Sequence, residues 1–305
     1  MITVLSGGTG TPKLIQGIKE IYPEEEINVI VNTVENNYFS GVYVAADIDT
    51  VLYTFSNLIN DETWYGIKDD TFITNERLAE IGTPELLRIG DQDRATKIQK
   101  TLLLKEHTLS EAVDIQRKNL GIKAKIIPMS DEHSEIKIET EEYGDIEFHD
   151  FLIKYQGQPT VTKVKYSEVN PSPDIIKIIQ DSDKVIIGPS NPITSILPII
   201  SLKGVSEELE NKKVIAVSPF IGTSPVSGPA GKFMSASGYE TSSIGVAKIY
   251  ESFLNTLIID SSDDEMIGEI EEIIPNVIAV NTIMKTIDDK KELAKLVLNS
   301  DKLKI

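Results

Sequence analysis

The residues best suited to chemistry lie at the start of the chain. The segment from Met1 to Glu20 has the pattern of a short apolar strand, the Gly-rich turn Ser6-Gly7-Gly8-Thr9-Gly10-Thr11, and a helix that begins at Pro12. Glycine permits positive φ and a close approach to a ligand, while Thr11 can cap the helix. The free N–H groups of this turn, assisted by Lys13, predict a phosphate site. A tight turn that binds nothing is the alternative interpretation.

Asp47 and Asp49 form a second candidate group, for metal binding or proton transfer. They end a long polar loop from Val34 to Asp49, and residues two apart in an extended loop point the same way. Both carboxylates could then face one ligand or one cation, for which we expect Mg2+, and one could act as a catalytic base. The alternative is that they only complement the dipole of a helix that begins near Thr50.

Two later segments have residues suited to a nucleotide. In Ser190-Asn191-Pro192, which follows an apolar run, Asn191 can offer both a donor and an acceptor to a purine edge, although Asn-Pro is also a frequent turn dipeptide. Ser227 to Lys232 has the pattern of a second anion-binding loop, in which Gly231 exposes its N–H and Lys232 supplies a charge. A disordered surface loop is the alternative for this second segment.

Composition excludes several classes of protein and of site. The 305 residues include 30 Lys and Arg against 48 Asp and Glu, so the net charge of -18 disfavours general binding to nucleic acid or to an anionic membrane. An anionic substrate therefore needs local N–H groups, a few placed cations or a divalent metal. The absence of Cys excludes disulfides, thiolate nucleophiles and Cys-type zinc sites. No signal peptide or membrane span is indicated, so we expect a cytoplasmic protein.

The elements that must position these residues follow a repeated pattern. Apolar runs of strand length alternate with helical segments, which predicts an α/β fold with a Rossmann-like, doubly wound, mainly parallel sheet of about six strands. The carboxyl ends of such strands share one edge, where ligands bind. After the strand at Ile2 to Leu5, the runs are Ile27 to Val31, Lys184 to Ile187, Lys213 to Val217, Thr256 to Ile259 and Asn276 to Val280.

The middle of the chain changes to a period-two pattern between Ala124 and Val164. We interpret Gly90 to about Tyr166 as an inserted α+β subdomain within a single Rossmann-like domain that spans residues 1–305.

Five segments together resemble one family, the 2-phospho-L-lactate transferases, which are the deazaflavin phospholactyl transferases of coenzyme F-420 biosynthesis. Each segment alone is a weak signal, but five in the same order are specific. The segments are Leu5 to Lys13, Asp47 to Tyr53, Gly90 to Thr96, Ile187 to Ile193 and Pro225 to Lys232.

This resemblance implies an activity and its partners. It implies a homodimer and a Mg2+-assisted transfer of a 2-phospho-L-lactate or phosphoenolpyruvate-type group from a guanosine diphosphate-linked donor. The acceptor is the terminal hydroxyl of 7,8-didemethyl-8-hydroxy-5-deazariboflavin, and GMP is released. The resemblance also places Asp49 and Arg88 in contact with the deazaflavin, whereas from the residues alone Arg88 could equally be a solvated surface side chain. The chain departs from the family pattern at Glu35-Asn36-Asn37, where acidic residues are usual.

Two other classes of function compete with this interpretation. A non-catalytic nucleotide-sugar-binding regulator of a related family would share the Gly-rich start, but Asp47, Asp49 and the segment from Arg88 to Arg94 favour the enzyme. A nicotinamide oxidoreductase is disfavoured, because Lys13 stands where the dinucleotide fingerprint has its third Gly. The sequence leaves open the exact donor, the catalytic base, and whether protein carboxylates or donor phosphates hold the Mg2+.

Overall fold

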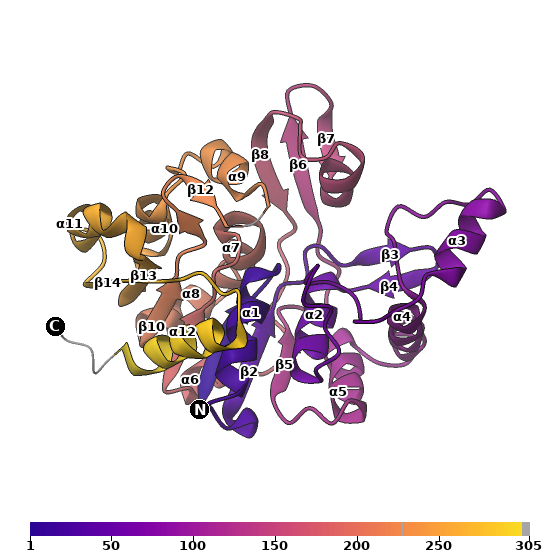
Figure 1. Ribbon diagram of the computed structural model, residues 1–305, viewed down its shortest axis with the longest axis horizontal. Helices are drawn as coiled ribbons and strands as arrows, with labels where there is room; N and C mark the ends of the chain where they lie inside the picture. Colours follow the sequence, from indigo (N-terminus) through magenta and orange to yellow (C-terminus); the bar gives the residue numbers. More distant parts are fainter. Residues whose placement is uncertain (227, 301–305) are drawn as a thin grey trace.

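A seven-stranded sheet runs through the middle of the protein, in a computed structural model that describes residues 1–226 and 228–300 (Figure 1). Its order is β14-β13-β10-β9-β1-β2-β5, and each neighbouring pair is parallel. The predicted α/β class and mainly parallel sheet are therefore confirmed. The strands are β1 (Ile2–Ser6), β2 (Ile27–Val31), β5 (Lys125–Pro128), β9 (Lys184–Ile187), β10 (Val214–Val217), β13 (Thr256–Asp260) and β14 (Asn276–Val280).

The strand order reverses between β1 and β9, which pair in register from Ile2 with Lys184 to Leu5 with Ile187. From β1 the chain builds one half of the sheet through β2 and β5, and it then crosses to β9 to build the other half. Ligands of doubly wound sheets bind beyond the carboxyl ends of the strands at such a reversal. The Gly-rich turn after β1 and the segment after β9 therefore meet at the expected ligand crevice.

Helices cover both faces of the sheet, because alternate strand residues point to opposite sides. On one face Val4 and Ile186 pack with α1 (Gly10–Lys19), α2 (Ala46–Phe55), α5 (Leu109–Asn119) and α12 (Ile287–Asn299). On the other face Leu5 and Ile187 belong to a second core, which includes residues from several further helices. These are α6 (Ile175–Asp181), α7 (Leu197–Ile200), α8 (Val205–Glu210), α9 (Ala230–Ala236), α10 (Ser243–Tyr250) and α11 (Ile267–Glu271).

Two smaller units project from the body in Figure 1. An arm, at the right of the view, contains the hairpin of β3 (Asn37–Phe39) and β4 (Val42–Val44) with α3 (Ile73–Glu80) and α4 (Asp91–Leu103). A three-stranded antiparallel sheet, at the top, has the order β7 (Gly144–Glu147), β6 (Ile136–Thr140), β8 (Val161–Tyr166). The shorter elements are η1 (Glu24–Glu26), η2 (Asp150–Lys154), η3 (Pro192–Ile196), η4 (Ser261–Met266), β11 (Phe220–Ile221) and β12 (Ser224–Pro225).

Two expectations about local structure are wrong. The predicted loop from Val34 to Asp49 contains the β3–β4 hairpin, and α2 begins at Ala46, so both Asp47 and Asp49 lie in its first turn. The predicted insertion from Gly90 to Tyr166 begins too early, because β5 pairs with β2 as the edge strand of the main sheet. The unit that is separate from this sheet is the antiparallel sheet of β6 to β8. Among the described helices, none is long and apolar enough to cross a membrane.

Candidate functional site

The Gly-rich turn is held against the segment that follows β9. A Cβ on Gly10 would lie 1.9 Å from the carbonyl oxygen of Pro189, and Gly8 has a φ of +56°, so both positions require glycine. Thr11 lies inside α1 and does not cap it; its hydroxyl is 2.5 Å from that of Ser190. The Ser190 hydroxyl also donates to the carbonyl oxygen of Gly7. Ser190 thus fastens the turn to the β9 segment.

A carboxylate already occupies part of this turn. The N–H of Gly8 donates to Oδ1 of Asp47 at 2.7 Å, and Nδ2 of Asn32 donates to Oδ2 at 3.1 Å. Burial raises the pKa of Asp47 to about 6, although these two hydrogen bonds oppose the change. Burial and the nearby Asp47 charge likewise raise the pKa of Glu35 well above its usual range. The turn therefore lies beside two carboxyl groups that are costly to ionise in the free protein.

Asp49, two residues later, faces a different set of partners. One oxygen accepts from Nζ of Lys100, and the other accepts from Nζ of Lys97 at 3.1 Å. Burial alone would raise the pKa of Asp49, but the two ammonium groups outweigh burial and lower it. The expectation that Asp47 and Asp49 face one cation is wrong in its geometry, since a helix places residues two apart on different sides. Asp49 is a poor candidate for a base, because its lowered pKa makes it a weak proton acceptor.

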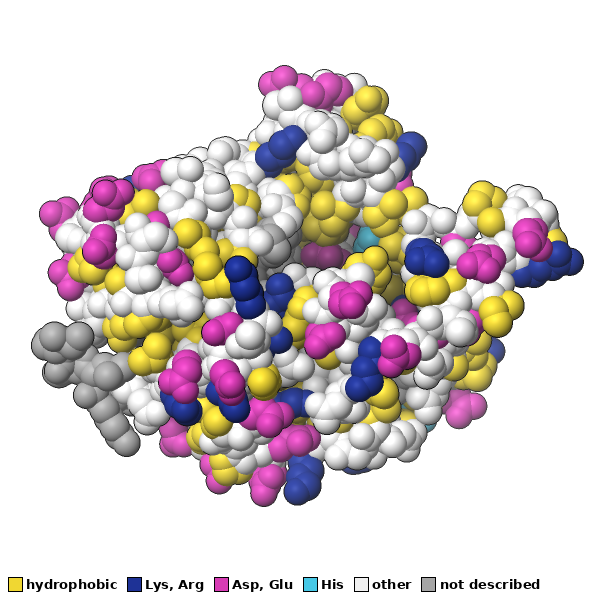
Figure 2. Space-filling view, in the orientation of Figure 1, with side chains coloured by type: hydrophobic (Ala, Val, Ile, Leu, Met, Phe, Trp, Pro, Cys, Tyr) yellow, Lys and Arg dark blue, Asp and Glu magenta, His cyan; other side chains and the backbone are white. Residues whose placement is uncertain are grey.

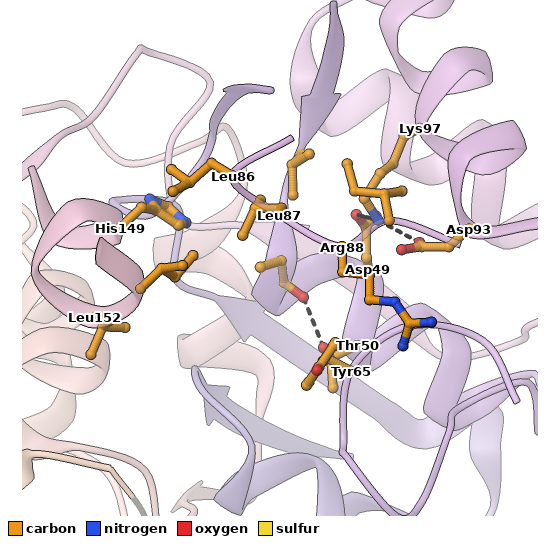
Figure 3. Close-up of a pocket in the computed structure, with 15 residues that line it drawn as sticks. Asp49, Thr50, Tyr65, Leu86, Leu87, Arg88, Asp93, Lys97, His149 and Leu152 are labelled. Atoms are coloured by element: carbon orange, nitrogen blue, oxygen red, sulfur yellow. Dashed lines mark hydrogen bonds and ion pairs between the residues drawn. The ribbon is translucent and has the colours of Figure 1, made fainter. Parts of the chain in front are cut away.

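Asp49 and Arg88 nevertheless line one cavity of about 530 Å³ (Figure 3). The cavity lies near the arm, and Figure 2 shows a hollow with hydrophobic side chains between the arm and the three-stranded sheet. Leu87 and Leu152 contribute to its apolar walls. The guanidinium of Arg88 lies 3.7 Å from the ring centroid of Phe72, which orients this exposed side chain. The structure thus brings together the two residues that the resemblance assigned to a flat deazaflavin ring.

Lys97 and His149 of this cavity were missed by the reasoning from sequence, whereas Asp93, which also lines it, lies within the motif from Gly90 to Thr96. On α4 the buried positions include Asp93, Lys97 and Lys100, while Ile98 and Leu102 are 45% and 55% exposed. Charged residues thus occupy the face of α4 where apolar ones are usual. A charged stripe at helical spacing was the available signal, but only the structure shows which face is buried. For His149, from the segment after β7, the sequence contained no comparable signal; burial lowers its pKa.

The other residues that we predicted to bind the nucleotide-linked donor lie at or near the Gly-rich turn and η3. Oδ1 of Asn191 accepts hydrogen bonds from the N–H groups of Ile193 and Thr194, so this side chain caps η3. This agrees with the interpretation of Asn191 as a turn residue. Among the hydrogen bonds of the described residues, none uses the Nδ2 group of its side chain. Nζ of Lys13 lies 5.4 Å from the ring centroid of Trp64. Thr9 stands at the N-cap of α1 without a side-chain capping bond.

The proposed second anion loop has a structural role at both of its named residues. Nζ of Lys232 donates to the carbonyl oxygens of Gly157 and Gln158, at 2.6 and 2.9 Å, and so joins α9 to the segment before β8. Gly231 lies within α9, where a Cβ would come 2.8 Å from Thr241. Ser227 of the same segment lies outside the described residues.

A metal ion would find few ligands here without help from a substrate. Within residues 1–226 and 228–300 there is no group of three or more His, Asp or Glu side chains that could hold one. Glu35 and Asn36 line a cavity of about 10 Å³, and both amide atoms of the buried Asn36 lack a hydrogen-bond partner. A small oxygen-lined space beside unpaired polar atoms fits one hard cation whose other ligands come from phosphate.

The protein is thus of the parallel α/β class, with a glycine-lined crevice at the reversal of strand order and, beside it, a largely apolar cavity with charged residues in its floor. Over residues 2–296 the chain matches the family model described as 2-phospho-L-lactate transferase CofD. The chain belongs to this family, as the five motifs predicted.

Individual relatives agree over the full length. A protein named 2-phospho-L-lactate transferase from Methanothermobacter thermautotrophicus is 57% identical over 298 residues, which cover 98% of this chain and 97% of the relative. One of the same name from Methanocaldococcus jannaschii is 51% identical over 305 residues, covering 98% and 97%. The fold is similar to a crystal structure of a UPF0052 family member from Bacillus halodurans, with a TM-score of 0.67, 14% identity and coverage of 97% and 98%.

Proposed function

We propose that this protein transfers a 2-phospho-L-lactate group, or its phosphoenolpyruvate-type analogue, from a guanosine diphosphate-linked donor to 7,8-didemethyl-8-hydroxy-5-deazariboflavin. One observation supports the pairing of donor and acceptor above all. The first turn of α2 directs Asp47 to the Gly-rich turn and Asp49 to the ring-sized cavity. One helix turn therefore links the phosphate site to the ring site, as a transfer between the two requires.

In the proposed reaction the terminal hydroxyl oxygen of the acceptor attacks the phosphorus that bears the transferred group. A new P–O bond forms, the P–O bond to the nucleotide breaks, and GMP leaves with its electron pair. Asp47 takes the hydroxyl proton, because a carboxyl with a pKa near 6 is a suitable base at neutral pH. The N–H groups around Gly8 stabilise charge on the phosphate oxygens once the donor displaces or shares the Asp47 contact.

Mg2+ is part of this proposal, but we propose other ligands for it than Asp47 and Asp49, the pair that the sequence suggested. Asp49 is already bound by two lysines, whereas Glu35 and Asn36 line one small cavity, and Glu35 is close enough to Asp47 to feel its charge. These two residues would hold the ion together with donor phosphates, and the ion would neutralise charge that this acidic protein does not.

The homodimer and the cytoplasmic location remain predictions from the resemblance and the composition. The exposed Ile98 and Leu102 on α4 provide an apolar surface suited to a second copy. Sedimentation of the wild type and of a variant with Lys at both positions tests this; a monomeric wild type would contradict the dimer.

The activity is tested by incubating the protein with the deazaflavin, Mg2+ and each candidate donor. Mass spectrometry should detect the deazaflavin with the added phosphodiester group, together with GMP. Asp47→Asn should lower turnover by about 10²-fold or more. Asp114→Asn is the matched control, because Asp114 lies on α5 in an ion pair with Arg117 and does not line the site. Product formed equally by both variants would remove Asp47 from the reaction, and no product with either donor would refute the proposed function.

A further inference from the structure

The floor of the acceptor cavity contains a cation to which the proposed reaction gives no role. Lys97 is only 4% exposed, yet it lines the cavity together with Asp49 and Asp93 (Figure 3). Its Nζ donates to Oδ2 of Asp49 and to Oδ1 of Asp93. An ammonium group has three N–H donors, and the described residues accept only two of those of Lys97.

Lys97 and Lys100 form a buried cluster with Asp49 and Asp93, and a comparison of the two lysines shows that Lys97 does more than balance charge. Lys100 is fully buried, pairs with the other oxygen of Asp49 and is not among the residues that line the cavity. Two lysines balance two aspartates, so the cluster is neutral as a whole. Lys97 stays charged, because Asp49 and Asp93 outweigh the effect of burial on its pKa and raise it. Only one of the two ammonium groups can therefore reach a molecule in the cavity.

The cavity floor presents a donor beside an acceptor. Each oxygen of Asp49 accepts one lysine hydrogen bond, and a carboxylate has about four acceptor positions, so Asp49 can accept another. The walls are largely apolar, with Val44, Leu87 and Ile89 among them. This arrangement fits a flat apolar ring whose edge has a carbonyl oxygen next to an N–H group. A pyrimidinedione ring, the polar end of a deazaflavin, has such an edge.

We infer that Lys97 is a specificity-determining residue that donates a hydrogen bond to a ring carbonyl oxygen of the acceptor, while Asp49 accepts from the adjacent ring N–H. This inference rests on the proposed function, since it concerns the acceptor of that reaction. Lys97 and Asp49 then select rings with an imide edge over rings of the same size without one. Arg88, outside the cluster and stacked on Phe72, is free to contact another part of the ligand.

The test measures affinity for the deazaflavin, whose fluorescence reports binding, and for acridine, a tricyclic ring without a pyrimidinedione. Lys97→Met should weaken deazaflavin binding by about tenfold to a hundredfold, the usual range for loss of a hydrogen bond to a charged group, and should leave acridine binding little changed. Lys100→Met is the matched control, because it removes the other ion pair of Asp49 without altering the cavity wall. It should weaken deazaflavin binding at least fivefold less than Lys97→Met does.

Three results separate the possibilities. Equal losses in the two lysine variants would mean that both act only by holding Asp49, and would overturn the inference. So would a Lys97→Met variant that keeps the wild-type preference for deazaflavin over acridine. A folded wild type that binds no deazaflavin would instead overturn the proposed function.

Because Lys97→Met could unfold a buried cluster, Raman spectra of deazaflavin bound to the wild type give a second measurement. A ring carbonyl stretch at lower frequency in the complex than in an aprotic solvent supports the hydrogen bond, and a stretch at the aprotic-solvent frequency contradicts it.

Discussion

Asp47→Asn is expected to make the protein more stable near pH 8 while it removes activity. The carboxyl group of Asp47 is buried, and its pKa is about 6 instead of the ordinary 3.8. A raised acid pKa means that ionisation is harder in the folded than in the unfolded state. The folded state therefore loses stability as pH rises from about 4 to about 6, and above that range it bears the full cost.

The magnitude follows from the size of this change. A pKa higher by about two pH units corresponds to about 3 kcal/mol at 25 °C, since each unit is worth about 1.4 kcal/mol. The Asn side chain keeps one acceptor for the N–H of Gly8 but turns an NH2 group toward Nδ2 of Asn32, at a cost of about 1 kcal/mol. The variant should thus exceed the wild type by about 2 kcal/mol at pH 8 and fall about 1 kcal/mol below it near pH 4. Removal of the Asp47 charge also makes Glu35 easier to ionise, which further stabilises the variant at high pH.

The assay is urea unfolding of both proteins at intervals from pH 4 to pH 8, without Mg2+ or donor. Only the difference between the two proteins matters, because their other titrating groups are shared. A reversal of the sign of this difference between pH 4 and pH 8 is the expected result. If Asp47→Asn is less stable than the wild type by the same amount at every pH, Asp47 is not ionised at a cost, and the argument for its role as a base near neutral pH fails.

Three further predictions use the same comparison of stability with function. Asp49→Asn should lower the free energy of unfolding by about 3 to 5 kcal/mol, because it leaves two lysines with too little negative charge in a buried cluster; an unchanged urea midpoint would show that the cluster is solvated. Gly10→Ala should destabilise the protein by more than about 3 kcal/mol, because the added methyl group clashes with Pro189. Gly8→Ala should cost about 1 to 2 kcal/mol, because the φ of Gly8 is positive. Equal unfolding midpoints of the two variants would contradict the close approach of Gly10 to Pro189. Chelation should abolish turnover and added Mg2+ should restore it, with a weaker Mg2+ dependence of activity in Glu35→Gln; full activity after exhaustive chelation would exclude the ion.

The sequence predicted the central strands well, because strands buried on both faces are continuous apolar runs. The strand β5 was missed since it has only Ile126 and Ile127 between Lys125 and Pro128, and an edge strand needs less apolar surface. The start of α2 was placed four residues late, because nothing local favours Ala46 over Thr50 as a helix start. Its N-cap, Ala45, accepts no side-chain capping bond that could mark the boundary.

The sequence predicted which residues lie at the candidate site more reliably than it predicted which groups they interact with. Asp49 and Arg88 do line one cavity, and the Gly-rich turn does lie at the strand reversal. Which carboxylate is ionised depends on Lys97 and Lys100, about 50 residues away in the chain, and on the burial of α4. Such charge pairing is set by tertiary packing, which no local pattern specifies.

The central position of β1 has a consequence for how the protein is made. This strand leaves the ribosome before its partner β9, which begins with Lys184, 182 residues after Ile2. At the usual pace of translation, about 5 to 20 residues per second, the β9 side of β1 waits about 10 to 40 s for its partner. The last described helix, α12, then closes over α1, where Gly17 gives room for the backbone of Lys290. Until β9 is made, the nascent chain thus exposes an apolar strand edge, which is the kind of surface that chaperones protect.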